Sequence, residues 1–378
     1  MLCALRFTEF RGYLLKMAIK SLKIQNIRNL RHVEFMPSAN VNLIHGVNGS
    51  GKTSLLEAIN FLGLTRSFRT RKFPYFVSRE QKESIVFSQL QGCSDQNSDS
   101  LGVSRDVSGA VNVRYNGSNI DISQLANLVP LLVINTDTFQ ILEGSPAIRR
   151  QFVDWGSFHA DQSYIHAWRS FKRVLQQRNS LLKCGKIDPQ IRRIWDVEFV
   201  KHAQQITQIR QRYINQLLPD FLAISERLMG EVDLSLSFSP GWDQKRPLDE
   251  LLDEQLQRDL KQGYTAAGPQ RADLRIKVDG VSAAERLSRG QKKLVVSALK
   301  LAQGAVYNKL KDDRCIYLID DLPSELDAQH CQLFCQFLEQ TESQCFITCV
   351  EPQSLMSYWQ STTEIKSFQI DNGQLRDT

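Results

Sequence analysis

The 378-residue sequence has no apolar run near the ~20 residues that a membrane-spanning helix needs. It has no internal repeat and no low-complexity tract, which argues against solenoids and long disordered segments. Its 20 glycines and 11 prolines do not gather into a linker. At the start, MLCALRFTEFRGYLLK breaks its apolar residues with charges, which is atypical of a signal peptide. We expect a globular cytoplasmic protein without a membrane partner, with residues 1–16 as a possible extension before Met17.

The eight cysteines lie mostly within apolar stretches, which is typical of reduced thiols buried in a cytosolic core. Cys331, Cys335, Cys345 and Cys349 can be written as two C-x3-C pairs, which superficially resemble a zinc site. The first pair lies in an amphipathic run, AQHCQLFCQFLEQ, and the second in a strand-like run, CFITCV. Burial explains both pairs, so we expect no zinc.

Regular patterns predict an α/β protein whose middle is helical. Strand-like runs, SLKIQNI and NVNLIHG, precede a helical TSLLEAINFLG, which we expect to stop at Gly63. SIVFSQL, VNVRYNG and PLLVIN indicate an antiparallel or mixed sheet. Two amphipathic helical faces follow, separated by a turn at 184–189, and strand-like sequence patterns occur again after Pro240. We therefore expect one α/β lobe from 17–144 and 261–378, with an inserted helical lobe at 145–260. The expected helical faces carry Trp168, Phe171, Leu175 and Leu182, then Trp195, Phe199, Ala203, Ile206, Tyr213 and Leu217.

Residues 46–53 match the phosphate-binding pattern G-x-x-x-x-G-K-[ST] in full. Glycines let consecutive backbone N–H groups turn toward phosphates, and the following helix adds its positive N-terminus. We expect Lys52 to reach the β- and γ-phosphates of ATP, and Thr53 to place a hydroxyl on Mg²⁺. A glycine-rich turn without a ligand is the alternative. The candidate nucleotide-binding residues here are Gly46, Val47, Asn48, Gly49, Ser50, Gly51, Lys52, Thr53 and Ser54.

A second acidic site is predicted where the apolar run of CIYLIDD ends in Asp320 and Asp321. Asp320 is expected to hold Mg²⁺ together with Thr53, and Asp321 to orient or deprotonate the attacking water. Without the phosphate-binding loop, an apolar run that ends in aspartate fits a plain strand end at a turn as well as it fits a catalytic site. Lys52, Asp320, Asp321 and Ser288 are the candidate catalytic residues.

Two further motifs narrow the class of P-loop protein. LSRGQKKL at 287–294 precedes a helical run, and SELD at 324–327 follows the acidic strand. Free N–H groups and a serine hydroxyl at a helix start favour an anion. If each motif is considered by itself, SRGQ and Ser324 are also explained as ordinary helix caps without a role in ATP binding.

The ordered set of four motifs resembles the ABC-type ATPases. In that family, signature residues here numbered Ser288, Gly290 and Gln291 bind ATP held by the opposite subunit, and Asp327 crosses the dimer interface. The resemblance implies an α/β ABC-type head, a mixed sheet with flanking helices and an inserted helical lobe, which dimerises around two ATP molecules. The histidine that many ABC proteins carry after the equivalent of CFITCV is missing, so the sequence assigns no γ-phosphate sensor.

The sequence also contains the stretches IQNIRNL, LTRSFRT, LEGSPAIRRQFVDW and QQRNSLLK. These stretches resemble the RecF family in particular. GPQRADL at 268–274 reads GPHRDDL in most relatives, so Gln270 and Ala272 depart from the pattern and receive no family role. The resemblance implies a weak, DNA-stimulated ATPase that dimerises on gapped DNA or single-strand/double-strand junctions and assists recombinase loading with RecO and RecR.

Charge supports a DNA partner only modestly. Residues 149–212 hold thirteen Lys or Arg against five Asp or Glu, a surplus of eight, whereas the whole chain carries +6. Two alternative explanations of these charges are a solvated face of a helix and a contact between subdomains through Arg149 and Arg150. Trp168 and Trp195 fit core anchors better than base-stacking platforms. Another SMC/Rad50-like DNA-end ATPase, a transporter ATPase subunit and a metabolic P-loop kinase are the alternative functions.

Overall fold

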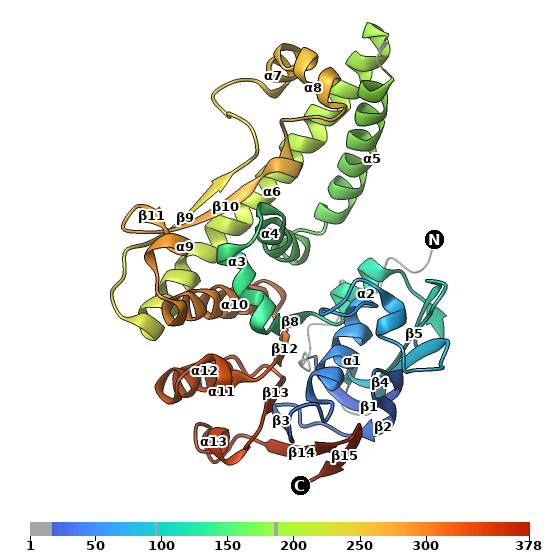
Figure 1. The fold of residues 1–378 in the computed structure, drawn as a ribbon, viewed down its shortest axis with the longest axis vertical. Helices are drawn as coiled ribbons and strands as arrows, with labels where there is room; N and C mark the ends of the chain where they lie inside the picture. Colours follow the sequence, from blue (N-terminus) through green and yellow to red (C-terminus); the bar gives the residue numbers. More distant parts are fainter. Residues whose placement is uncertain (1–16, 95–96, 185–187) are drawn as a thin grey trace. The chain divides into compact units, whose positions relative to one another are not determined.

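A computed structural model describes residues 17–94, 97–184 and 188–378 of the protein. The possible N-terminal extension and the middle of the turn predicted at 184–189 lie outside the described residues. The chain divides into two compact units, Met1–Asp137 with Tyr307–Thr378, and Thr138–Val306 (Figure 1). The predicted insert, 145–260, falls inside the second unit, which extends beyond it on both sides.

The first unit contains two six-stranded sheets. One is antiparallel throughout, in the order β2-β1-β4-β5-β6-β7. The other has the order β15-β14-β3-β13-β12-β8, with β14, β3, β13, β12 and β8 parallel and β15 antiparallel. The strands are β1 Ile19–Ile27, β2 Leu30–Phe35, β3 Val41–His45, β4 Glu83–Ser94, β5 Asn97–Asp106, β6 Val111–Tyr115, β7 Ser118–Asn119, β8 Leu131–Ile134, β12 Ile316–Ile319, β13 Cys345–Cys349, β14 Ile365–Asp371 and β15 Gln374–Asp377.

One hydrophobic core joins both sheets through the helix that follows the phosphate-binding loop. Ile44, Leu56 and Phe346 belong to this core together with Leu22 and Val86 of the antiparallel sheet. The inner strands β12 and β13 are buried along their length, as continuous apolar runs predict. The helices of this unit are α1 Lys52–Leu64, α2 Ile122–Leu128, α11 Leu322–Glu325, α12 Ala328–Thr341 and α13 Gln353–Met356. The short 3-10 turns are Phe73–Tyr75 and, at the border of the units, Thr136–Phe139.

Three local predictions for this unit were wrong in part. Between the predicted strands SLKIQNI and NVNLIHG lies a further strand, β2, because Leu30, Val33 and Phe35 are buried and alternate with exposed polar residues. PLLVIN forms β8, which pairs with β12 in the parallel sheet. Helix α1 passes Gly63 and ends at Leu64; a Cβ on Gly63 would lie 2.6 Å from the side chain of Leu131, so close packing explains this glycine.

The second unit combines helices with a three-stranded sheet, β11-β10-β9, so it is not purely helical. Helices α5 and α6 pair around Phe171, Phe199, Ala203 and Ile206. The elements are α3 Gln140–Glu143, α4 Pro146–Ala160, α5 Tyr164–Lys183, α6 Pro189–Met229, β9 Leu234–Ser239, α7 Leu248–Glu254, α8 Leu256–Gln262, a 3-10 turn Pro269–Arg271, β10 Asp273–Val278, β11 Val281–Ser282, α9 Ala283–Arg286 and α10 Arg289–Lys311, whose end enters the first unit.

The predicted helical faces are largely the buried ones. On α6, Phe199, Ala203, Ile206, Tyr213 and Leu217 are buried, as expected. On α5 the buried face is rotated slightly, since it contains Ala167, Phe171, Val174 and Leu182. Trp168 and Trp195 are partly buried and pack against this core, which favours their reading as anchors.

Candidate nucleotide-binding site

The phosphate-binding loop lies between β3 and α1, as the sequence predicts. Its glycines have φ of 148° at Gly46, 82° at Gly49 and 124° at Gly51, a region that side chains disfavour. A Cβ on Gly46 would lie 2.3 Å from the carbonyl oxygen of Ile370, so the chain itself requires this glycine. A Cβ on Gly49 would meet nothing within 4 Å. The loop therefore has one packed side and one open side.

Lys52 places its ammonium inside the loop. Its Nζ donates to the carbonyl oxygens of Gly46 at 2.6 Å and Val47 at 3.2 Å, and approaches Asn48 Oδ1 at 3.5 Å. The residue is 8% exposed. Because no acidic residue occupies the first turn of α1, the positive helix end and the ammonium act together to favour an anion. Of the remaining candidates, Ser50, Gly51 and Ser54 are buried, and Thr53 is half-buried.

Two turns hold the loop from its packed side. The carbonyl oxygen of Ser50 accepts hydrogen bonds from Asn29 Nδ2 and from the backbone N–H of Gly373, both at 2.9 Å. Asn29 lies in the turn between β1 and β2, and Gly373 in the β14–β15 turn. A Cβ on Gly373 would lie 2.2 Å from the Asn29 carbonyl oxygen, so the two turns touch. This contact gives IQNIRNL a role that the sequence did not reveal.

The stretches IQNIRNL and LTRSFRT meet at a buried carboxylate of α1. Glu57 is fully buried and binds Arg28 through two hydrogen bonds of 3.0 Å. The Ser67 hydroxyl also donates to Glu57, and Arg69 lies 3.6 Å from it. The motifs on both flanks of the phosphate-binding loop are thus tied to the helix that begins at Lys52.

Asp320 and Thr53 lie together at the ends of β12 and the loop. The Thr53 hydroxyl lies 3.1 Å from both carboxylate oxygens of Asp320, and the Thr348 hydroxyl donates to Asp320 Oδ1 at 2.8 Å. Burial raises the pKa of Asp320 above its ordinary value; the bonds from Thr348 and Thr53 oppose this, and the charge of Asp321 adds to it. The carboxylate therefore occupies a setting that a cation would stabilise.

Asp321 has a left-handed backbone, with φ 55° and ψ 50°, in a sharp turn after β12. Its N–H donates to Thr348 Oγ1 at 2.7 Å, and its carboxylate accepts from the Ser324 hydroxyl at 2.6 Å. Thr348, on β13, thus contacts both aspartates, although we did not single it out from the sequence. A polar side chain within the otherwise apolar CFITCV was the signal that could have identified it.

The LSRGQKKL motif begins α10 in the second unit. Ser288 N–H donates to Gln291 Oε1 at 3.0 Å, and Gln291 N–H donates to the Ser288 hydroxyl at 3.3 Å. This reciprocal pair is a capping box. Both residues are exposed, and a Cβ on Gly290 would meet nothing within 4 Å. Packing within the chain therefore does not require a glycine here.

SELD spans α11 and the start of α12. Asp327 caps α12, because its carboxylate accepts from His330 N–H at 3.0 Å, and it also contacts the His330 ring. These interactions lower the pKa of Asp327. Ser324 lies within α11 and donates to Asp321, so the alternative reading of Ser324 as a helix cap is wrong.

The four cysteines of the two C-x3-C patterns are free thiols and are buried, on α12 and β13. Burial raises the pKa of Cys331 and of Cys349 to about 11. They are therefore protonated at neutral pH and fit core thiols. Within the described ranges, no group of three or more His, Cys, Asp or Glu could hold a metal ion, and no helix is long and apolar enough to cross a membrane.

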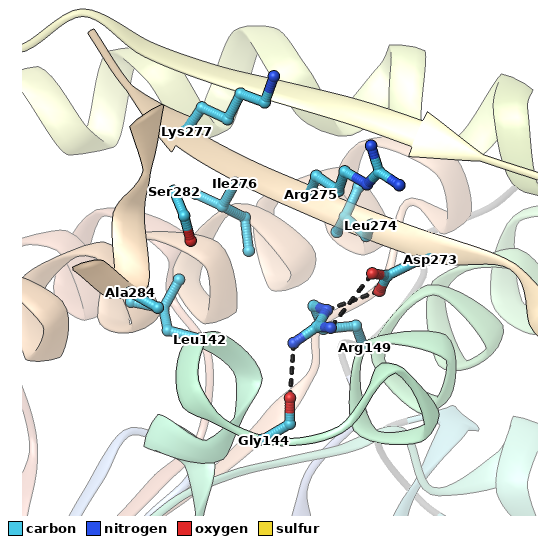
Figure 2. A pocket seen from close by; sticks show the side chains of 10 residues that line it. All are labelled: Leu142, Gly144, Arg149, Asp273, Leu274, Arg275, Ile276, Lys277, Ser282 and Ala284. Atoms are coloured by element: carbon cyan, nitrogen blue, oxygen red, sulfur yellow. Dashed lines mark hydrogen bonds and ion pairs between the residues drawn. The ribbon is translucent and has the colours of Figure 1, made fainter. Parts of the chain in front are cut away.

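Several arginines of the second unit bind carboxylates or carbonyl oxygens of the same unit. Arg149 binds Asp273 at 2.7 Å and the Gly144 carbonyl at 2.8 Å, beside a pocket of about 340 Å³ along β10 (Figure 2). Arg150 donates to the Ala272 carbonyl at 2.9 Å. The stretches LEGSPAIRRQFVDW and GPQRADL therefore contact each other, which supports the subdomain-contact alternative. Other arginines with carboxylate partners are Arg178, Arg192, Arg210 and Arg212.

The departures in GPQRADL fit this packing. Ala272 is fully buried. The Gln270 side chain donates to the carbonyl oxygens of Thr265 at 3.1 Å and Ala267 at 3.0 Å. Both residues hold the turn before β10.

Comparisons with known proteins agree along the whole chain. A sequence model of the family described as "RecF/RecN/SMC N terminal domain" matches residues 18–372. The protein named DNA replication and repair protein RecF from Pseudomonas aeruginosa (strain LESB58) is 44% identical over 96% of this chain and 98% of its own. Its counterpart in Stutzerimonas stutzeri (strain A1501) is 45% identical over 95% of this chain and 97% of its own.

Solved structures agree in fold. A structure described as the recombination mediator protein RecF-ATP in the RecFOR pathway covers 98% of this chain and 100% of its own, with a TM-score of 0.86 and 24% identity. An Smc head bound to the C-terminal winged-helix domain of ScpA covers 95% of this chain and 96% of its own, with a TM-score of 0.59 and 16% identity. The mixed α/β head expected from the sequence is confirmed. On the sequence matches, the chain belongs to the RecF family within the RecF/RecN/SMC group.

Proposed function

We propose that the protein is an ATP-operated dimer that binds DNA in replication and repair. One observation carries this proposal: a phosphate-binding loop held open on one side, with Lys52 at its centre and Thr53 hydrogen-bonded to Asp320. Two turns and a buried carboxylate support this arrangement. Preorganised N–H groups and a positive helix end suit a triphosphate.

Thr53 and Asp320 are the residues that would hold Mg²⁺. Their oxygen atoms are the ligand type that Mg²⁺ takes, and two protein ligands suit an ion that keeps water and phosphate oxygens around it. Mg²⁺ would neutralise charge on the β- and γ-phosphates. Asp321 would orient or deprotonate the attacking water, and Thr348 would hold both aspartates in place.

Two copies would complete each ATP site. Ser288, Gly290 and Gln291 form an exposed helix start that is suited to the γ-phosphate of ATP on the partner. Asp327 would lie near the interface. Hydrolysis would then separate the copies, and we propose slow, DNA-stimulated turnover, as suits a switch.

The cellular role follows from the family. Relatives more than 40% identical are named DNA replication and repair protein RecF, and a structural neighbour is described as a recombination mediator in the RecFOR pathway. For this chain we propose binding to gapped DNA or single-strand/double-strand junctions in the cytoplasm, and recombinase loading with RecO and RecR.

Mixing two inactive variants tests the composite site. Lys52→Ala removes the phosphate contact and Ser288→Ala removes the signature hydroxyl, so each variant alone should lack ATPase activity. A mixed dimer keeps one intact site, formed by Lys52 of one copy and Ser288 of the other. Recovered activity supports the proposal. No recovery, despite mixed dimers demonstrated by mass, contradicts it.

DNA titrations separate the remaining alternatives. ATP-dependent affinity for gapped, duplex and single-stranded DNA should be measured across a salt series. Preference for gapped DNA supports the proposed role, whereas preference for free duplex ends favours another SMC/Rad50-like ATPase. Co-purification with a membrane partner and no DNA binding would favour a transporter subunit.

A further inference from the structure

Helix α5 has an exposed face that carries positive charge and no negative charge. None of its 20 residues is Asp or Glu. Its buried face packs against α6 through Ala167, Phe171 and Val174. The exposed residues on the opposite side are His166, Arg169, Lys172, Arg173, Gln176, Gln177, Ser180 and Lys183.

Lys172, Arg173 and Lys183, which we call the basic stripe, have no carboxylate within salt-bridge distance in the described part of the chain. Lys172 lies over the Trp168 ring, with Nζ 5.0 Å from its centroid. By contrast, Arg178, on the buried face of α5, binds Asp196 and Asp259. The charge surplus predicted for 149–212 is therefore partly cancelled inside the unit and partly left on α5.

The composition of this face favours nucleic acid over protein or lipid. No large hydrophobic side chain is exposed on α5 among the described residues. Protein interfaces usually have an apolar core, and interfacial helices insert an apolar face into lipid. Lysine, arginine, glutamine and serine are the side chains that commonly contact phosphate oxygens.

The spacing of the stripe fits a duplex. Lys172 and Lys183 are separated by eleven residues, or about 16 Å along a helix that rises 1.5 Å per residue. Duplex DNA rises ~3.4 Å per base pair along its axis, so a stripe of this length laid along the duplex passes about five base pairs. Cations fixed on a rigid helix suit a rigid duplex better than a flexible single strand.

We propose that the basic stripe of α5 binds the phosphate backbone of the duplex part of the DNA substrate. This rests on the proposed function, because it assigns a surface to the DNA binding proposed above. The contact is independent of base sequence. It therefore supplies affinity and orientation, and leaves recognition of the gap to other parts of the dimer.

The test is a salt series with two matched triple variants. Lys172→Gln/Arg173→Gln/Lys183→Gln removes the stripe. Lys201→Gln/Arg212→Gln/Arg246→Gln removes three exposed cations that each have a carboxylate partner. Both variants change net charge equally. Duplex and gapped DNA affinities are measured with ATP between 50 and 200 mM salt, together with binding of a fluorescent ATP analogue.

Loss of three phosphate contacts should lower the slope of log affinity against log salt by about 2.7 and weaken duplex binding by at least about tenfold at 0.1 M salt. The control variant should keep most of the salt slope and most of the duplex affinity. Both triple variants should bind the ATP analogue as wild type does. If the stripe variant keeps wild-type affinity and slope, the assignment is wrong, and an acidic protein partner becomes the occupant to test. If wild-type protein binds no DNA, the proposed function itself fails.

Discussion

Replacing Gly290 by alanine should affect the stability of the monomer and the ATP-dependent dimerisation in opposite directions. Gly290 is the second residue of α10, and a Cβ there would meet nothing within 4 Å. Alanine is favoured over glycine in helices by roughly 0.5–1 kcal/mol, and we take the lower value so close to the helix start. The nucleotide-free monomer should therefore become slightly more stable, by about 0.5 kcal/mol. ATP-dependent dimerisation should nevertheless weaken, because the added methyl group would meet the partner's nucleotide.

Gly156→Ala is the matched control in a helix of the same unit. A Cβ at Gly156 would lie 1.8 Å from Tyr213 Cζ, so this substitution overpacks the core and should cost about 1–3 kcal/mol. Chemical unfolding without nucleotide measures both stabilities, and sedimentation with ATP and Mg²⁺ measures dimerisation. A Gly290→Ala protein that dimerises as wild type does would refute the reasoning, because the signature helix would then not face a nucleotide.

Three further substitutions address the nucleotide site. Thr348→Val removes the hydroxyl that contacts Asp320 and the Asp321 N–H; steady-state kinetics should show kcat at least about tenfold lower with ATP affinity nearly unchanged, and Thr348→Ser should restore activity. Asn29→Ala removes one of two hydrogen bonds to the Ser50 carbonyl and should weaken binding of an ATP analogue about fivefold, or ~1 kcal/mol; unchanged affinity would exclude a role for this turn. Because burial raises the folded pKa of Asp320, the free energy of unfolding should fall as pH rises from the ordinary value of 3.8 through the folded pKa. Asp320→Asn should remove this fall, raise the melting temperature of the nucleotide-free protein at pH 7 and abolish ATP hydrolysis. A lower melting temperature would contradict the assigned direction of the pKa shift.

The features that the sequence predicted well are those that a short stretch determines alone. The loop at 46–53, the strand before Asp320 and the helix after Ser288 follow from local pattern and spacing. The buried run CFITCV likewise forms a strand.

The features that were missed depend on contacts between distant segments. PLLVIN has no local property that chooses its sheet, and its partner, β12, lies far along the chain. Charge counting also failed to show which cations are neutralised, since Arg149 is paired with Asp273, outside the counted window. Thr348 is ordinary in a strand until the fold places Asp320 and Asp321 beside it.

The central claim, that ATP joins two copies of this chain, is tested most directly by mass. Sedimentation of wild-type protein with Mg²⁺ and a non-hydrolysable ATP analogue should give a dimer, whereas protein without nucleotide, with ADP, or carrying Lys52→Arg should stay monomeric. A wild-type protein that binds the analogue and remains a monomer at all concentrations would contradict the account.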